Sequence, residues 1–268
     1  MRADPLHSED PAIVQFDVTD AIATIRLNRP ERRNALSLAA NKQLHGLWRR
    51  IDGDPSIRVV VLTSADCGTF CAGMDLKEAV WLRKETGKDI LDLLDDPFYE
   101  HMRKVRVPIV AAMTGHFTAA GMVLAANCDL RVALAGTMGG ITEARVGRGT
   151  PWAAPMVAML PQAVLMEMVT TAEMLPVERL LALGFLNAVE PTPDAVRQRA
   201  HAYARAIAAN APLSVATGKA GLLASSDLGA FAGYELSKAL HQPVYASADA
   251  QEGPRAFAEK RAPRWLGR

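Results

Sequence analysis

Two glycine-bearing segments constrain the fold of this chain more than any other feature. Residues 70–76 read Phe-Cys-Ala-Gly-Met-Asp-Leu, and residues 115–122 read Gly-His-Phe-Thr-Ala-Ala-Gly-Met. Each follows an apolar, strand-like run and precedes a helix-like run, so we expect two helix N-termini to meet. A helix start presents unpaired backbone N–H groups and the positive end of the helix dipole. Two such starts directed at one point can hold a developing oxyanion without any charged side chain.

The surrounding pattern predicts an α/β fold built from repeated strand–loop–helix units. Residues 12–18 and 21–27 flank the turn pair Thr19-Asp20 and are typical of a β-hairpin. Apolar side chains at three- and four-residue spacing predict a helix over residues 38–51. Buried strands are expected at residues 59–62, 109–113 and 130–134. Because the unit recurs at about forty-residue spacing, the sequence predicts a spiral of ββα units.

The C-terminal part of the chain is Ala-rich and has helical periodicity. Pro212, Asp227 and Pro243 punctuate it. Four helices are expected there, over residues 196–209, 214–224, 228–241 and 246–260. No low-complexity linker is present, so we place a soft boundary near Pro191 and predict a core over residues 1–190 and a helical region over residues 191–268.

Charge argues against nucleic acid or an acidic membrane as a partner. The 268 residues carry 30 basic and 29 acidic side chains, without a dense Lys/Arg run. An anionic ligand must therefore be bound by local groups. A chain of this length can bury roughly 70 to 75% of its unfolded surface, which is enough for a stable core.

Targeting signals and metal motifs are not recognisable in the sequence. Residues 1–10 have no apolar run of signal-peptide length, and apolar runs elsewhere are too short or too interrupted to span a bilayer. We therefore expect a cytoplasmic protein. Cys67, Cys71 and Cys128 lack the spacing of a zinc site and are interpreted as buried thiols, and the six histidines are scattered. No metal site is predicted.

At the two glycine segments the chain resembles the crotonase superfamily, the enoyl-CoA hydratase and isomerase group. Further segments look like the family's and occur in its order: residues 27–36, 128–129, 143–147 and 252–261. The resemblance implies the family's spiral of ββα units with a C-terminal helical trimerisation region. It also implies thioester enolate chemistry on an acyl-CoA, with coenzyme A as part of the substrate and without a metal or redox cofactor. A homotrimer or a dimer of trimers is expected.

By the same resemblance, the two oxyanion donors are backbone amides. Met74 supplies one from the first segment, and Ala120 supplies the other from the second. Ala119 and Ala120 stand where the family commonly has glycine, and only glycine adopts a positive φ at little cost. An alanine keeps the backbone N–H donor that a glycine would supply. The backbone geometry at these alanines therefore decides whether the oxyanion hole forms.

The carboxylates discriminate between reactions. Family members that hydrate a double bond hold one water between two glutamates, and this chain has Val123 at the first position and Glu143 at the second. A single carboxylate can instead remove a proton from one acyl carbon and return it two carbons along. That reaction is Δ3,Δ2-enoyl-CoA isomerisation, which we expect here.

Glu143 needs a raised pKa to act as a base near neutral pH. Ile141, Val146 and Trp152 are close in sequence and are expected to raise it through apolar burial. Arg145 would lower it by turning inward. The alternative is a surface carboxylate paired with Arg145.

Other interpretations stay open. A hydratase, or hydro-lyase, with an atypical second acid or base has His116, Asp75, Arg148 and Glu78 as candidates. A catalytically silent homologue would bind acyl-CoA or RNA as a scaffold, although the charge weighs against RNA. Hydrolysis or dehalogenation of other CoA thioesters would use the same oxyanion hole, but no Asp lies where the dehalogenase nucleophile is expected.

Coenzyme A binding is assigned by resemblance alone. The residues are Arg33, Ala35, Ala72, Asp75, Leu76, Phe257 and Lys260. Arg33 and Ala35 match phosphate and pantetheine contacts. The backbone of Ala72, Asp75 and Leu76 matches the adenine pocket. Phe257 and Lys260 match positions from which family members contact the nucleotide bound by a neighbouring subunit. Residues 86–96 are predicted to form a mobile helical segment beside the cleft that sets the length of the acyl pocket.

Overall fold

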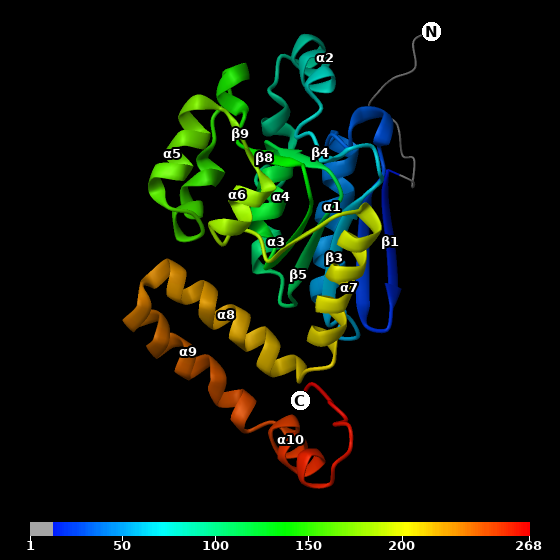
Figure 1. Ribbon diagram of the computed structural model, residues 1–268, viewed down its shortest axis with the longest axis vertical. Helices are drawn as coiled ribbons and strands as arrows, with labels where there is room; N and C mark the ends of the chain where they lie inside the picture. The colour runs from blue at the N-terminus through cyan, green and yellow to red at the C-terminus, as the bar shows by residue number, and fades with distance from the viewer. Residues whose placement is uncertain (1–12) are drawn as a thin grey trace.

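The computed structural model describes residues 13–268, and the arrangement of its elements is drawn in Figure 1. The strands are β1 (Val14–Thr19), β2 (Ile22–Leu27), β3 (Val59–Ser64), β4 (Thr69–Cys71), β5 (Ile109–Met113), β6 (His116–Thr118), β7 (Leu130–Leu134), β8 (Met138–Gly140), β9 (Met174–Pro176) and β10 (Ala188–Glu190). The α-helices are α1 (Leu38–Gly53), α2 (Leu76–Thr86), α3 (Glu100–Lys104), α4 (Ala120–Asn127), α5 (Gln162–Thr171), α6 (Val177–Ala182), α7 (Pro193–Ala208), α8 (Pro212–Leu228), α9 (Ala230–Tyr245) and α10 (Ala248–Ala258). The 3-10 helices are η1 (Pro30–Arg32), η2 (Ile90–Leu93), η3 (Glu143–Val146) and η4 (Pro151–Ala158).

The strands form two sheets. The larger sheet has the order β1-β2-β3-β5-β7-β10 and the smaller one β4-β6-β8-β9. Each of the successive pairs β3/β4, β5/β6 and β7/β8 places its first strand in the larger sheet and its second in the smaller. The pairs lie parallel to one another within both sheets. This is the predicted spiral of ββα units.

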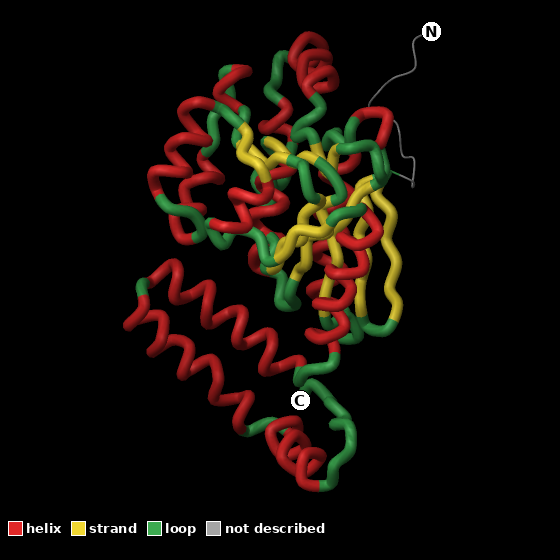
Figure 2. The backbone as a smooth tube through the Cα atoms, viewed as in Figure 1, coloured by secondary structure: helices red, strands yellow, loops and turns green. Residues whose placement is uncertain are grey.

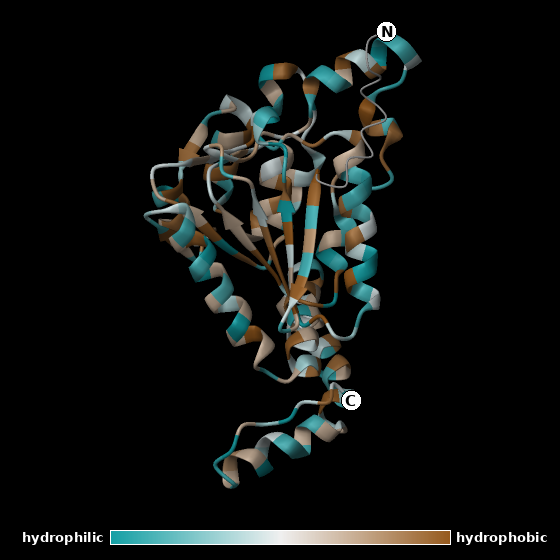
Figure 3. Ribbon diagram, turned by 90° about the vertical axis from the view of Figure 1, so that its right-hand side faces the viewer, coloured by the Kyte–Doolittle hydropathy of each residue, from teal (hydrophilic) through white to brown (hydrophobic). Residues whose placement is uncertain are grey.

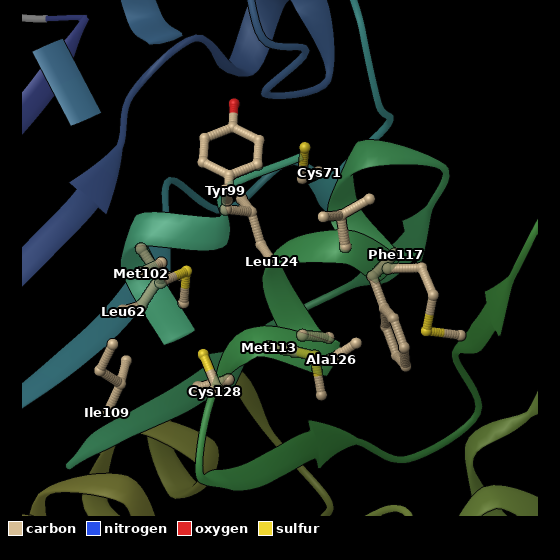
Figure 4. Close-up of a cluster of buried hydrophobic side chains, with 14 of the residues drawn as sticks. Leu62, Cys71, Tyr99, Met102, Ile109, Met113, Phe117, Leu124, Ala126 and Cys128 are labelled. Atoms are coloured by element: carbon tan, nitrogen blue, oxygen red, sulfur yellow. The ribbon is translucent and has the colours of Figure 1, made fainter. Parts of the chain in front are cut away.

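The larger sheet is buried on both faces because helices cover it on both sides. Successive residues of β3 point to opposite faces: Val59 and Val61 pack with Val196 and Ala200 of α7. The alternate residues join the main core, which is filled by α1 and α4 together with large side chains such as Trp48. Figure 4 shows part of this core around Met113, Phe117 and Leu124. Figure 3 shows hydrophobic residues running along the central strands.

Most of the predicted elements are confirmed, with small shifts at their ends. Strands β5 and β7 have the expected bounds, and α1 begins where Ser37 accepts a hydrogen bond from the amide of Ala40 at 3.1 Å. The start of the predicted hairpin at residue 12 and the expectations for residues 1–10 lie outside the described residues.

Three details of the prediction are wrong. Residues 86–96 are not one helical segment, because Gly87 adopts a φ of 71° that ends α2 before the short η2. Pro243 does not break α9, whose last turn continues with the amide of Ala246 donating to Gln242. Cys67 is exposed, whereas Cys71 and Cys128 are buried thiols as expected.

The last three helices extend away from the sheets. Helices α8 and α9 form an antiparallel pair, and α10 lies at the far end of the molecule from β4 and β8, as Figures 1 and 2 show. The side chain of Lys219 in α8 links this pair to the core through an ion pair with Asp129 at 2.8 Å. Among residues 13–268, none of the helices combines the length and apolar character that a membrane crossing needs. The expected cytoplasmic location stays a prediction.

Candidate active site

The first glycine segment forms a tight turn between β4 and α2. Gly73 has a φ of 96°, a conformation that other residues rarely adopt. Asp75 is the N-cap of α2, where its carboxylate accepts from the amide of Glu78 at 3.3 Å. Arg29 forms an ion pair with Asp75 at 3.1 Å, which fixes the start of the helix. Asp75 is therefore a structural cap.

The second segment brings the start of α4 against the first. Gly121 contacts β4 so closely that a Cβ atom there would lie 2.3 Å from the carbonyl oxygen of Cys71. A Cβ atom on Gly73 would lie 2.8 Å from the Cβ of Ala119 and 3.4 Å from the nitrogen of Ala120. The two loops are thus in direct contact through their glycines. The expected meeting of two helix N-termini is confirmed.

Of the two alanines in this segment, Ala119 has the strained backbone conformation. Ala119 has a φ of 52° and a ψ of −121°, while Ala120 is the first residue of α4. The departure from glycine therefore strains Ala119 and leaves the donor residue Ala120 in ordinary helical geometry. Neither the Met74 amide nor the Ala120 amide donates to another group within the described part of the chain. Both amides are thus free to donate to a ligand, as the predicted oxyanion hole requires.

Met74 and Ala120 both line a cavity of about 310 Å³ at one edge of the smaller sheet. Parallel pairing of β4, β6 and β8 brings the three segments that follow these strands to the same edge. The cavity is lined by Ala72, Met74, Leu76, Leu91, Pro97, Phe98, Ala119, Ala120, Val123, Thr142, Glu143, Arg145, Val146, Arg148, Gly149 and Trp152.

Glu143 is the first residue of η3, shortly after β8, and it lines this cavity. Its Oε1 accepts a hydrogen bond from the indole Nε1 of Trp152 at 3.2 Å, and its buried Oε2 has no partner in the described residues. Burial raises the pKa of Glu143, and hydrogen bonds from its own amide, from Trp152 and from the amide of Thr142 partly oppose this. Arg145 instead pairs with Glu173 at 3.0 Å, so the alternative of a Glu143–Arg145 surface pair is wrong.

The cavity has an apolar residue at the position where the family resemblance predicts a second carboxylate in hydratases. Val123 is 3% exposed and lines the cavity from α4. Within the described residues, Glu143 is the one carboxylate in the cavity lining. Among residues 13–268, the lining thus combines one carboxylate, Glu143, with Met74 and Ala120, whose amides have no partner.

Three other candidate acids or bases have structural partners. His116 lies in β6, where its Nδ1 accepts from the amide of Met138 at 3.0 Å. Glu78 accepts from the amide of Leu38 at 2.9 Å, and burial raises its pKa. Arg148 lines the cavity, but Asp89 of the α2–η2 connection binds it bidentately at 2.5 and 2.7 Å. That ion pair holds the pKa of Asp89 to about 2.

Comparison with known proteins identifies the family. The family model described as enoyl-CoA hydratase/isomerase matches residues 17–268. The chain belongs to the enoyl-CoA hydratase/isomerase family. It is 34% identical over 265 residues to the (E)-benzylidenesuccinyl-CoA hydratase of Thauera aromatica, covering 95% of this chain and 99% of that protein. It is 32% identical to the enoyl-CoA hydratase EchA19 of Mycobacterium tuberculosis, covering 91% of this chain and 92% of that protein.

Solved structures of this family share the fold. An enoyl-CoA hydratase from Bacillus anthracis superposes with a TM-score of 0.88 at 26% identity, covering 96% of this chain and 100% of that one. Enoyl-CoA hydratase EchA1 from Mycobacterium marinum gives a TM-score of 0.85 at 33% identity, with the same coverage. The crotonase-type fold and an acyl-CoA enzyme are thereby confirmed.

Five of the residues assigned to coenzyme A lie together beside the oxyanion loops. The amide of Ala72 donates to the carbonyl of Arg33 at 3.2 Å, and the amide of Leu36 donates to that of Gly73 at 2.8 Å. These bonds place residues 33–35 against residues 72–76, next to the cavity. Arg33 is exposed and free to meet an anion, whereas Ala35 is buried.

Phe257 and Lys260 lie elsewhere in the chain. They belong to α10 and the residues that follow it, at the end of the molecule far from α2, β4 and β8 (Figure 1). Phe257 is 87% exposed. Their contact with a nucleotide across a subunit interface stays a prediction, as does the absence of a metal or redox cofactor.

Sequence reasoning missed the hydrogen-bonding role of Trp152 and the aromatic wall formed by Phe98. Trp152 was expected only as an apolar neighbour of Glu143. It lies nine positions later across two 3-10 helices, and no regular spacing in the sequence indicates that the indole N–H faces the carboxylate.

Proposed function

We propose that this family member is a one-glutamate Δ3,Δ2-enoyl-CoA isomerase. The observation that carries the proposal is the cavity lining, in which Glu143 is the one carboxylate among the described residues and faces the same space as the Met74 and Ala120 amides. Val123 occupies the position from which a second proton-transfer group would be expected. A single base favours proton transfer within the substrate over addition of water.

The reaction follows from these groups. The thioester oxygen accepts hydrogen bonds from the amides of Met74 and Ala120, and Glu143 takes a proton from carbon 2 of a 3-enoyl-CoA. The electron pair of that C–H bond delocalises into an enolate, whose negative charge the two amides stabilise. Glu143 then returns the proton to carbon 4, and the double bond forms between carbons 2 and 3. The carboxylate is regenerated, and no water is consumed.

The cavity wall supports an apolar acyl group. Leu91, Phe98, Val123 and Trp152 are among the residues that line the cavity. The printed names of the relatives include hydratases of benzylidenesuccinyl-CoA and of mevalonyl-CoA, so acyl groups differ widely within this family. Aryl-bearing esters therefore belong beside straight-chain esters in an assay panel.

A hydratase is the second candidate, because the relatives named above carry that name. It requires a further acid or base at the cavity. Arg148 is the remaining candidate that lines the cavity, and Asp89 holds it in a bidentate ion pair. A guanidinium is a poor proton donor, since its pKa lies far above neutral pH.

A trimer or a dimer of trimers is proposed for the assembly. Large apolar side chains project from α8 and α9, including Leu222 at 76% exposure and Phe231 at 80%. Such a surface is typical of a protein interface. Association through these helices would leave α10, with Phe257 and Lys260, available to a neighbouring subunit.

The test is turnover of 3-enoyl-CoA and 2-enoyl-CoA esters by the wild type and by Glu143→Gln, with products identified by mass. The proposal expects 2-enoyl products that are lost in Glu143→Gln and retained in the control Glu167→Gln, an exposed carboxylate on α5. Hydration of 2-enoyl-CoA without isomerisation would contradict the proposal and favour the hydratase. Binding of CoA esters without turnover would favour a silent homologue.

A further inference from the structure

We propose that Trp152 is a positioning residue for Glu143, holding Oε1 so that Oε2 is the atom that receives the substrate proton. This inference rests on the proposed function of Glu143 as the single base. It concerns a residue outside the oxyanion loops and outside the coenzyme A contacts.

The two carboxylate oxygens of Glu143 have different surroundings. Oε1 accepts from the Trp152 indole at 3.2 Å, whereas Oε2 is buried and has no hydrogen-bond partner among the described residues. An unpaired buried oxygen is costly, and such atoms are rare in folded proteins. Glu143 lines the acyl cavity, so the proton that a bound acyl group gives up is the partner available to this oxygen.

The indole is held in place by its own helix. Pro151 is the first residue of η4, the amide of Ala153 donates to Thr150 at 3.0 Å, and the side chains of Ala153 and Met156 are buried in the core. Trp152 also stands between the acyl cavity and a second cavity of about 420 Å³, together with Phe98 and Val123. A fixed ring therefore gives the carboxylate a fixed orientation, which proton transfer between two carbons requires.

Trp152 also controls when Glu143 is ionised. The charged groups nearest in the lining are Arg145 and Arg148, and each is paired with another carboxylate, Glu173 and Asp89 respectively. Trp152 is the one side chain in the described residues that donates to Glu143. Its hydrogen bond stabilises the ionised form and opposes burial, so removing the donor raises the pKa of Glu143.

The first test compares the pH dependence of kcat and KM for wild type and Trp152→Phe, which keeps an aromatic ring without the donor. Activity requires ionised Glu143, so it is lost as the pH falls through the pKa of that group. We expect the acidic limb of kcat to move to higher pH by about one unit, the size of one hydrogen bond to a charged group. We also expect kcat to fall about tenfold and KM to stay within about twofold.

The matched control is Trp265→Phe. The indole of Trp265 donates to the carbonyl of Ala209 at 2.7 Å, away from the cavity, so its loss should leave the acidic limb unmoved. An unchanged limb in Trp152→Phe, or a change in KM alone, would overturn the inference and leave Trp152 as a wall of the cavity.

Two further measurements keep the inference testable if turnover is absent or if Trp152→Phe misfolds. Infrared difference spectra of the free protein follow protonation of Glu143, a band that Glu143→Gln identifies, and its midpoint should rise in Trp152→Phe. Biosynthetic 5-fluorotryptophan strengthens the N–H donor of the otherwise intact protein, so the same midpoint should fall. A midpoint that neither change moves would overturn the inference. Full turnover by Glu143→Gln would instead defeat the proposed function while the infrared result still reports the hydrogen bond.

Discussion

At the scale of single residues, Ala119 carries backbone strain at the start of α4. Its φ of 52° and ψ of −121° suit glycine, and an L-residue there costs on the order of 1–3 kcal/mol. We predict that Ala119→Gly stabilises the protein by about 1 kcal/mol, since the greater freedom of glycine in the unfolded chain offsets part of the gain. Urea unfolding measures this difference. A lower midpoint for the variant would show that the Cβ contact with Gly73 outweighs the backbone strain.

The ionisation of Glu143 makes the stability of the fold depend on pH. Because burial raises its pKa, the fold favours the protonated form: this contribution is present below the unfolded-state pKa and is lost as the pH rises through the folded-state pKa. Glu143→Gln should therefore be more stable than wild type at neutral pH, with a smaller difference in acid. Denaturation midpoints of wild type and Glu143→Gln, measured at neutral pH and in acid, test this.

The control for that prediction has the opposite sign. The ion pair with Arg179 holds the pKa of Glu167 below its usual range, so Glu167→Gln should lose stability at neutral pH. Equal pH dependence in the Glu143 and Glu167 variants would contradict the assignment of Glu143 as a buried carboxylate with a raised pKa.

At the scale of elements, Gly121 joins α4 to β4. A Cβ atom at Gly121 would lie 2.3 Å from the carbonyl oxygen of Cys71, so Gly121→Ala must push the two loops apart. We predict a loss of about 1–3 kcal/mol in the free energy of unfolding and a large loss of turnover. Gly46→Ala is the matched control, because a Cβ atom there meets nothing within 4 Å and an alanine in the middle of α1 should stabilise it. Wild-type turnover in Gly121→Ala would contradict the account of the loop contact.

The elements differ in how well the sequence predicts them. Strands β3 and β5 are continuous apolar runs, and Ser37 caps α1, so local patterns suffice for both. Residues 86–96, beside the cavity, are different. Gly87 ends α2 there, and Asp89 pairs with Arg148, which lies 59 residues away in the chain, so no local pattern predicts the conformation of this segment.

The same limit applies to the candidate site. Glu143, Met74 and Ala120 are assigned by family resemblance, and the structure brings them to one cavity because each comes shortly after a strand of the smaller sheet, whose parallel pairing aligns these strand ends. The Trp152–Glu143 hydrogen bond is not predictable, because η3 and η4 have no regular spacing that relates one side chain to the other.

At the scale of the whole molecule, α8 and α9 present an apolar surface that a single chain leaves uncovered. The exposed side chains include Leu222, Leu228, Phe231 and Tyr234. We predict a particle of three or six chains of 28.8 kDa each by light scattering. Phe231→Asp should shift it toward the monomer, because burying an unpaired charge in an interface is costly. A monomeric wild type would contradict the trimer and the role assigned to α10.

The central claim is that one carboxylate both removes and returns the substrate proton. The most direct measurement uses a 3-enoyl-CoA carrying deuterium at carbon 2, turned over in ordinary water, with the label in the product located by mass and NMR. One-base transfer by Glu143 predicts 2-enoyl product with deuterium at carbon 4 above the level set by exchange with solvent, and none formed by Glu143→Gln. Product that contains added water, or no deuterium at carbon 4 in the wild type, would contradict the account.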